Sequence, residues 1–264
     1  MEQLSHRVRA NIMGLAIDPI EFDAAVEKIL FFAHSRPAKY VCVNSAQDVV
    51  IAQHDPRFRD IVNQADLATA DGWPVVWSIR SRGMQQSGRV TGPDLMLATC
   101  EKSVAKGTRH FLYGGAEEVP ALLTGKLEQR FPGITICGAH SPPFRKLTEA
   151  EDLAEIDMIN QSKADVLWIG ISTPKQHFWL QDHIHKLDVG VVITVGAAFD
   201  FHSGRVNRAP KWMRDHGLEW LHRAAKEPKR LGSRYAKYLP QFFYMSLAQR
   251  LGLKEYSILD CKTK

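Results

Sequence analysis

The chain has 264 residues, 45% of them hydrophobic and 24% charged, a composition typical of folded globular proteins that excludes extensive disorder. The formal net charge is +5, and it is unevenly distributed. Residues 205–238 hold ten Lys/Arg and three Asp/Glu, a net +7, so the rest of the chain sums to −2. A polyanion or an anionic membrane is therefore expected to bind residues 205–238 rather than the rest of the chain.

Short apolar stretches alternate with helical patterns along the body of the chain. Near-continuous apolar strands that alternate with helices predict an α/β fold with a largely parallel sheet covered by helices on both faces. After residue 196 the pattern is helical only, and we expect Pro228 and Pro240 to interrupt it. The expected strands are 11–17, 40–44, 66–70, 109–115, 134–140, 165–172 and 190–196. The expected helices are 20–35, 46–65, 92–107, 117–131, 148–162, 174–187, 210–228 and 229–252.

Small or polar residues follow five of the expected strands. Asn44, Asp71, the pair Gly114 and Gly115, Gln176, and the pair Gly196 and Asp200 all stand at or just after a strand end. The carboxyl ends of parallel strands lie along one edge of a sheet, where α/β proteins bind ligands. The spacing therefore predicts a single site at this edge.

Three of these strand ends allow more than one interpretation. Gly114 and Gly115 let a phosphate or a sugar approach the backbone, or they form an ordinary tight turn. Asp71 is either a general base or the N-cap of a helix that begins near Pro74. Asp200 holds either a ribose hydroxyl or a backbone turn.

Several kinds of site have no support in the sequence. The dinucleotide fingerprint GxGxxG, the P-loop and the GxSxG elbow are absent, as is any Asp-x-Asp pair. The four cysteines form no CxxC pair, so we expect reduced thiols and neither a zinc site nor a disulfide. His177, His183 and His185 lack metal-binding spacing and are expected on a helix surface. We expect no metal and no cofactor.

Taken in order, seven segments resemble the WecG/TagA/CpsF glycosyltransferases, glycosyltransferase family 26. The resemblance extends from about Gly14 to about Tyr238. The segments are YVCVN, ADLATADGWPVVW, RVTGPDL, FLYGG, IGISTPKQ, VGAAFDFHSGRVNRAP and GLEWLHRAAKEPKR.

The resemblance implies an inverting, metal-independent transfer of a hexose or N-acetylhexosamine-type sugar. The donor is a UDP-sugar, and the acceptor is a polyprenyl-pyrophosphate-linked saccharide in cell-surface or exopolysaccharide biosynthesis. It also implies a Rossmann-like catalytic domain, placed at residues 1–204, and a basic helical appendage at 205–264 that closes the site and contacts an anionic membrane. A homo-oligomer is among the expected states.

The resemblance also assigns roles to residues. Asp71 matches the proposed general base. The matches near the donor or acceptor are Asn44, Arg89 of RVTG, Gly114, Gly115 and Gln176, with Gly196 and Asp200 added from their strand end. The expected pyrophosphate-binding residues are Arg208, Arg214, Arg223 and Arg230.

Two positions depart from the family pattern. Cys42 stands where many members carry a Thr two residues before the strand-end Asn, so a sugar-orienting hydroxyl is replaced by a weakly hydrogen-bonding thiol. His177 stands where the PKQ motif usually continues with Glu. Because sugar specificity depends on a few such contacts, the donor stays open among UDP-N-acetylmannosamine, its uronic acid and UDP-glucose.

Two other classes of protein compete with a transferase. One is a different UDP-sugar-binding α/β enzyme, an epimerase or a dehydrogenase, which the missing dinucleotide fingerprint disfavours. The other is a basic nucleic-acid-binding module, which the acidic body and the lack of a reader motif disfavour. With no apolar run near the roughly 18 to 20 residues of a membrane span and no signal peptide, we expect a cytoplasmic protein, peripheral on the inner face of the cell membrane.

Overall fold

A parallel sheet organises the fold, as the strand patterns predict. The computed structural model describes residues 7–258, and within them the strands form a two-stranded and a six-stranded sheet, the latter in the order β4-β3-β8-β7-β5-β6. The pairs β3–β8, β8–β7, β7–β5 and β5–β6 are all parallel. This confirms the α/β class and fits a Rossmann-like fold. The six strands are β3 (Lys39–Asn44), β4 (Leu67–Ala70), β5 (Arg109–Gly114), β6 (Thr135–His140), β7 (Val166–Gly170) and β8 (Val191–Thr194).

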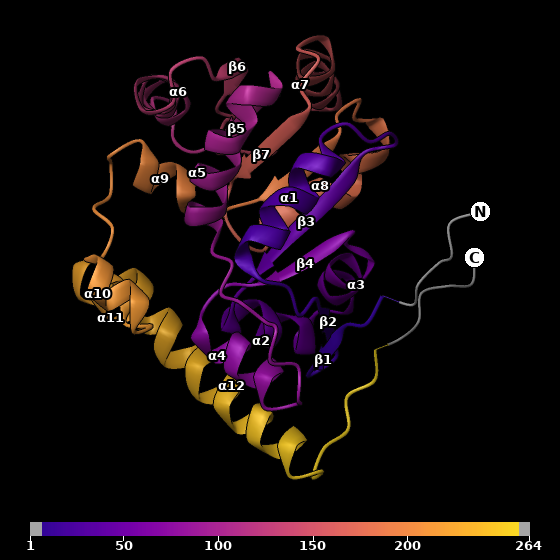
Figure 1. The fold of residues 1–264 in the computed structure, drawn as a ribbon, viewed down its shortest axis with the longest axis vertical. Coiled ribbons are helices and arrows are strands. Elements are labelled where there is room, and N and C mark those ends of the chain that lie inside the picture. The colour runs from indigo at the N-terminus through magenta and orange to yellow at the C-terminus, as the bar shows by residue number, and fades with distance from the viewer. Residues whose placement is uncertain (1–6, 259–264) are drawn as a thin grey trace. The chain divides into compact units, whose positions relative to one another are not determined.

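Helices connect the strands and cover the sheet. In Figure 1, α5 and α6 lie on one side of β5 and β7, and α7 and α8 lie on the other. The helices up to β8 are α1 (Phe22–Phe32), α2 (Ala46–His54), α3 (Pro56–Gln64), α4 (Trp73–Arg80), α5 (Gly92–Ser103), η1 (Val104–Lys106), α6 (Val119–Arg130), α7 (Glu149–Gln161), α8 (Lys175–His183) and η2 (Ile184–Lys186). After β8 come α9 (Ala198–His202), α10 (Lys211–Asp215), α11 (Glu219–Lys226), the π-helical turn η3 (Pro228–Gly232) and α12 (Ser233–Arg250).

The chain divides into two compact units. Unit 1 combines the described parts of Met1–Glu21, Asn44–Val90 and Ala209–Lys264. Unit 2 combines Phe22–Val43 and Thr91–Arg208. Unit 1 is therefore assembled from three separate segments, and the C-terminal helices belong with the N-terminal hairpin. The domain boundary predicted after residue 204 stays a prediction.

The single strand predicted at 11–17 is wrong, because the segment is a hairpin. β1 (Ala10–Ile12) pairs antiparallel with β2 (Leu15–Ile17). Met13 and Gly14 both have positive φ, 49° and 84°, the geometry of a tight two-residue hairpin turn. The side-chain oxygen of Asn11 accepts a hydrogen bond from the Gly14 amide at 2.8 Å, which supports the turn.

The single helix predicted at 46–65 is also wrong. α2 and α3 are separated at Asp55, whose extended backbone ends one helix and caps the next. The Asp55 side chain accepts a hydrogen bond from the Phe58 amide at 3.0 Å, and Pro56 occupies the first turn of α3. A capping Asp followed by Pro is a helix start, and this local signal overrides the continuous apolar pattern.

The longest C-terminal helix runs through the residue expected to interrupt it. Pro240 lies inside α12, so the predicted interruption there is wrong, whereas Pro228 does begin the π-helical turn. Pro240 and Ala236, whose carbonyl loses its helical donor, are both exposed, so water can satisfy that carbonyl. The opposite face of α12 buries Phe242 and Met245 and packs against α2 (Figure 1).

A buried histidine in unit 2 has a defined protonation state. Trp168 Nε1–H donates to His110 Nδ1 at 3.1 Å, so Nδ1 carries no proton. Ser103 Oγ donates to the Cys100 carbonyl and therefore accepts from His110 Nε2–H at 2.7 Å. Both ring nitrogens are satisfied only in the neutral tautomer, and burial lowers the pKa of His110 from 6.5 to about 4.

This histidine predicts a pH dependence of stability. His110 protonates near pH 6.5 in the unfolded chain and near pH 4 in the folded chain, so the unfolded state binds more protons between these values. We expect the free energy of unfolding to fall by up to about 3 kcal/mol as the pH drops from 6.5 to 4. Urea unfolding across this range measures the fall, and His110→Gln should flatten its slope. An unchanged slope in that variant would assign the acid sensitivity to other groups.

Candidate functional site

The predicted base lies one residue beyond a strand of unit 1. Asp71 follows β4, and its backbone N–H donates to the carbonyl of Asn44 at 2.7 Å. The Asn44 side chain is buried and donates through Nδ2 to the carbonyl of Thr69 at 3.3 Å. The structure thus brings Asn44 and Asp71 together, as the strand-end pattern predicts.

The helix that follows Asp71 does not use it as a cap. The N-cap of α4 is Gly72, with φ of 98° and no side-chain hydrogen bond, and Pro74 lies in the first turn. The alternative interpretation of Asp71 as the N-cap residue is therefore wrong. Because Gly72 carries a backbone conformation that L-residues avoid, the chain turns sharply and leaves the half-buried Asp71 between strand and helix.

The segment between α10 and α11 packs closely on this turn. A Cβ at Gly217 would lie 2.5 Å from Cδ1 of Trp73, and Gly217 has φ of 74°. Trp73 also stacks on Trp77, with ring centroids 6.2 Å apart. Sequence reasoning treated Trp73 as part of a motif and gave it no role, yet its ring is the contact between the C-terminal segment and the turn that carries Asp71.

A charged residue of the C-terminal segment pairs with Arg89. Arg89 Nη1 lies 3.9 Å from Glu219 Oε2, and both side chains are mostly buried. Arg214 in α10 and Arg223 in α11 are half-buried. Arg230 lies in the π-helical turn, and its side chain falls outside the described part of the chain. Glu219 is a partner of Arg89 that the sequence motifs did not reveal.

The two glycines after β5 lie in unit 2. Gly114 and Gly115 have φ of 127° and 82°, and the Gly115 amide donates to the Gly170 carbonyl at 3.1 Å. A Cβ at Gly114 would lie 2.6 Å from the Gly170 carbonyl carbon, and a Cβ at Gly115 would lie 2.7 Å from Val119 Cγ1. Close packing thus accounts for both glycines. Their role in ligand binding stays a prediction.

Gln176 and Gly196 come together in unit 2. Gln176 is buried in the first turn of α8, and its Oε1 accepts a hydrogen bond from the Gly196 amide at 3.2 Å. Its Nε2 donates to Thr173 Oγ1 at 3.3 Å. The Gln176 side chain therefore joins the loop after β7 to the loop after β8. Asp200 lies half-buried in α9, and its carbonyl accepts a hydrogen bond from the Val206 amide at 3.0 Å.

Arg208, predicted to bind pyrophosphate, is paired with a carboxylate. Its Nη1 and Nη2 donate to the two carboxylate oxygens of Asp94, the second at 2.9 Å, and Nη2 also lies 3.4 Å from Thr91 Oγ1. The guanidinium also stands over the ring of Phe201. A bidentate pair of this kind is among the stronger polar contacts in proteins. It ties the end of unit 2 to the start of α5, and sequence reasoning did not anticipate it.

The two departures from the family pattern are both buried. Cys42 is fully buried in β3 and pairs in register with Thr194 of β8. The expected surface position is confirmed for His185 but wrong for His177 and His183, which lie within the fold. His183 is held there by Asp152 Oδ2, 2.8 Å from Nε2, and by the Trp179 carbonyl, 2.6 Å from Nδ1.

A polar cluster beside the glycine turn was not predicted. The Tyr113 hydroxyl donates to Glu155, and His140 Nε2 lies 3.1 Å from the other oxygen of the same carboxylate. Burial, followed by the Glu155 hydrogen bond, raises the pKa of Tyr113. Tyr113 precedes Gly114, and His140 ends β6, so the cluster ties two strand ends to α7. No local motif joins residues this far apart in the sequence.

Neither a metal-binding cluster nor a membrane-spanning helix occurs within residues 7–258. Within residues 7–258, no three His, Cys, Asp or Glu side chains gather in a group that could hold a metal ion. Over the same residues, no helix has both the length and the apolar character needed to cross a bilayer.

The parallel sheet, with polar residues and glycines at its strand ends, defines a Rossmann-like α/β protein of the ligand-binding type. The model of the glycosyl transferase WecG/TagA/CpsF family matches residues 10–256. The chain belongs to this family and is a glycosyltransferase.

Curated relatives agree with this assignment. Proteins of Staphylococcus aureus strains MW2, NCTC 8325 / PS 47 and COL are each 27% identical to the chain over 246 residues. The match covers 92% of this chain and 94% of each relative. All three are named N-acetylglucosaminyldiphosphoundecaprenol N-acetyl-beta-D-mannosaminyltransferase.

The Trp73–Gly217 contact predicts a loss of activity on a small change. Gly217→Ala should move the Trp73 ring, since its Cβ would lie 2.5 Å from that ring, and should lower the transfer rate by about tenfold or more. Gly252→Ala is the matched control: it also has positive φ, 67°, but no atom lies within 4 Å of the new Cβ. In both variants the alanine must adopt a left-handed backbone conformation, which costs about 1 to 2 kcal/mol. Equal transfer rates in the two variants would show that the Trp73–Gly217 contact does not affect activity.

Proposed function

We propose that this glycosyltransferase moves a sugar from a UDP-sugar to a polyprenyl-pyrophosphate-linked saccharide, with inversion at the anomeric carbon. The observation that carries the proposal is the family match over residues 10–256, within which the motif carboxylate Asp71 lies beside Asn44. The relatives' names specify an N-acetylglucosaminyl-diphosphoundecaprenol acceptor and an N-acetylmannosaminyl group. A lipid-linked diphosphate acceptor is accordingly the acceptor class we propose here.

The chemistry we propose begins at Asp71. Its carboxylate accepts the proton of the acceptor hydroxyl as that oxygen attacks the anomeric carbon from the face opposite UDP. The bond between the anomeric carbon and the UDP oxygen breaks, and both electrons leave with UDP. The fixed turn at Gly72 supports this role, since a base acts only from a defined position.

The departing diphosphate needs positive charge, and we propose that arginines of the C-terminal segment supply it without a divalent cation. The candidates for this role are Arg214, Arg223 and Arg230, which the resemblance to the family assigns to the pyrophosphate. Guanidinium groups bind phosphate oxygens bidentately and need no reorganisation if they are preplaced. Arg208 is assigned instead to holding Asp94, because its guanidinium already makes that bidentate pair.

The C-terminal helix offers a surface suited to a membrane. One face of α12 exposes Phe243, Tyr244 and Leu247, with Tyr244 75% exposed, and Leu251 continues the stripe. Lys237 and Arg250 flank it. An apolar stripe bordered by cations is the pattern of an interfacial helix, so we propose that α12 rests on an anionic membrane at the cytoplasmic face.

The proposed base predicts a specific kinetic defect. Asp71→Asn should lower kcat by roughly 10² to 10⁴-fold, because the amide cannot take the proton, and should leave UDP binding nearly intact. A radiolabelled-sugar transfer assay and calorimetric titration with UDP measure the two effects. Asp60→Asn, the same change on α3 of unit 1, should behave like the wild type. Full activity of the Asp71 variant would remove Asp71 from catalysis.

The proposed membrane face predicts a loss of vesicle binding. Replacing both Phe243 and Leu247 by Ser should weaken co-sedimentation with phosphatidylglycerol-containing vesicles by about tenfold or more, because two apolar side chains no longer leave water. Leu122→Ser removes an exposed leucine of α6 and serves as the control. Unchanged pelleting of the double variant would contradict the assignment. Point changes are preferable to truncation, since α12 packs on α2.

A further inference from the structure

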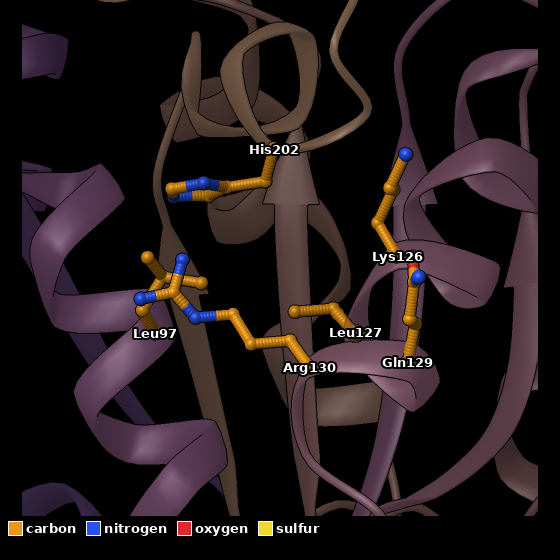
Figure 2. A pocket seen from close by; sticks show the side chains of 6 residues that line it. All are labelled: Leu97, Lys126, Leu127, Gln129, Arg130 and His202. Atoms are coloured by element: carbon orange, nitrogen blue, oxygen red, sulfur yellow. The ribbon is translucent and has the colours of Figure 1, made fainter.

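A cavity in unit 2 has a lining that includes none of the predicted site residues, although His202 in that lining stands two residues after Asp200 on α9. Its volume is about 240 Å³, and it opens between α5, α6 and the end of α9. In Figure 2 the side chains of Arg130 and His202 both extend into the space beside Leu97. The lining residues are Leu97, Lys126, Leu127, Gln129, Arg130 and His202.

The lining is basic and contains no carboxylate. Lys126 and Arg130 stand one turn apart on α6, a spacing at which like charges repel each other. Over residues 7–258, neither side chain forms an ion pair with an acid, and Arg130 stands instead over the ring of Phe131. Asp94 is the acid that acts on His202 electrostatically, and Arg208 already holds it through both carboxylate oxygens. The cavity therefore has an excess of positive charge.

His202 adds a polar group of defined character. Its Nε2 lies 2.8 Å from the Pro93 carbonyl, which only accepts, so Nε2 carries the proton and Nδ1 the lone pair. Burial lowers the pKa of His202, and the charges of Arg208 and Arg130 lower it further. The ring is neutral and presents an acceptor for a hydroxyl.

We propose that this cavity binds a phosphoryl group, as inorganic pyrophosphate or as the phosphate end of a larger ligand. Arg130 supplies a planar fork for two phosphate oxygens, and His202 supplies an acceptor for a protonated oxygen in the same space. Lys126 and Gln129 extend on the other side of Leu127 in Figure 2, so Lys126 contributes a more distant positive charge. Leu97 and Leu127 form an apolar wall of the cavity, whereas Lys126, Gln129 and Arg130 are exposed to solvent.

The cavity is separate from the donor site under the proposed function and does not depend on that function. α6 begins four residues after Gly115, and Arg130 is its last residue. Eleven residues of helix span about 16 Å, so a phosphate at the glycine turn would not reach Arg130. No motif in the sequence marked Lys126 or Arg130, and His202 lies within the segment VGAAFDFHSGRVNRAP, which gave it no role.

Calorimetric titration of the full-length protein with pyrophosphate tests the inference. We expect saturable binding whose Kd rises by about tenfold or more in Arg130→Gln and by a smaller factor in Lys126→Gln. Lys106→Gln removes the same charge from an exposed position of unit 2 and should leave the Kd unchanged. An unaltered melting temperature of the Arg130 variant verifies its fold, and a shift of the His202 ring signals on addition of pyrophosphate places the ligand.

Two further titrations separate the sources of the phosphate. UDP should bind the Arg130 variant as it binds the wild type, and a joint loss of UDP and pyrophosphate binding would merge the cavity with the donor site and overturn the proposal. If a short-chain polyprenyl pyrophosphate competes with inorganic pyrophosphate, the cavity is a site for a lipid-linked diphosphate. If it does not compete, the ligand of the cavity is a soluble phosphate. Absence of saturable pyrophosphate binding, or equal weakening by Lys106→Gln, would also overturn it.

Discussion

The hydrogen bond between the Asp71 amide and the Asn44 carbonyl is the constraint on which the proposed chemistry depends. It joins main-chain atoms at the ends of two consecutive strands, so the place of the carboxylate is set by the backbone and is independent of its own charge. Gly72 then turns the chain away, and Trp73 begins a helix whose ring meets Gly217. A short stretch of unit 1 thus links a strand end, a turn and the C-terminal segment.

A cationic side chain near a phosphate site either binds the phosphate or forms an ion pair within the fold. The contacts of Arg208 show how a structure distinguishes these two roles. Its motif position suggests a phosphate ligand, whereas its pairing with Asp94 shows a structural contact. The Asp94 carboxylate already accepts hydrogen bonds from Nη1 and Nη2 of Arg208 and therefore competes directly with any phosphate for these two nitrogens. Arg130 is the converse case, because no motif marks it and no acid pairs with it in the described chain.

Much of the fold could be predicted from periodicity, because buried parallel strands have an unmistakable apolar pattern. The errors arose where a single residue overrides the pattern. Gly14 turns one apolar run into a hairpin, and Asp55 followed by Pro56 divides one helical run in two. The error at Pro240 was the opposite one, because the interruption predicted there is absent. Solvent at this exposed face can satisfy the carbonyl that loses its helical donor, which removes much of the free-energy cost of a proline inside a helix.

The site was predictable only as far as its residues stand at strand ends. Asn44, Asp71, Gln176 and Gly196 were predicted as candidate site residues because parallel strands end at one edge of a sheet. Partners such as Glu219 for Arg89 come from segments far apart in the chain, and no local pattern encodes such pairings. The same holds for the neutral state of His110, which follows from two hydrogen bonds that only the folded chain supplies.

The three-part composition of unit 1 has a consequence for biosynthesis. Residues 22–43 and 91–208 of unit 2 leave the ribosome before α12 does, so unit 2 has all its segments while unit 1 still lacks its last one. Until α12 has been synthesised, the side of α2 that α12 covers stays uncovered on the nascent chain. Chaperones that bind apolar surfaces could therefore bind this side of α2 from the time α2 is made until α12 packs on it.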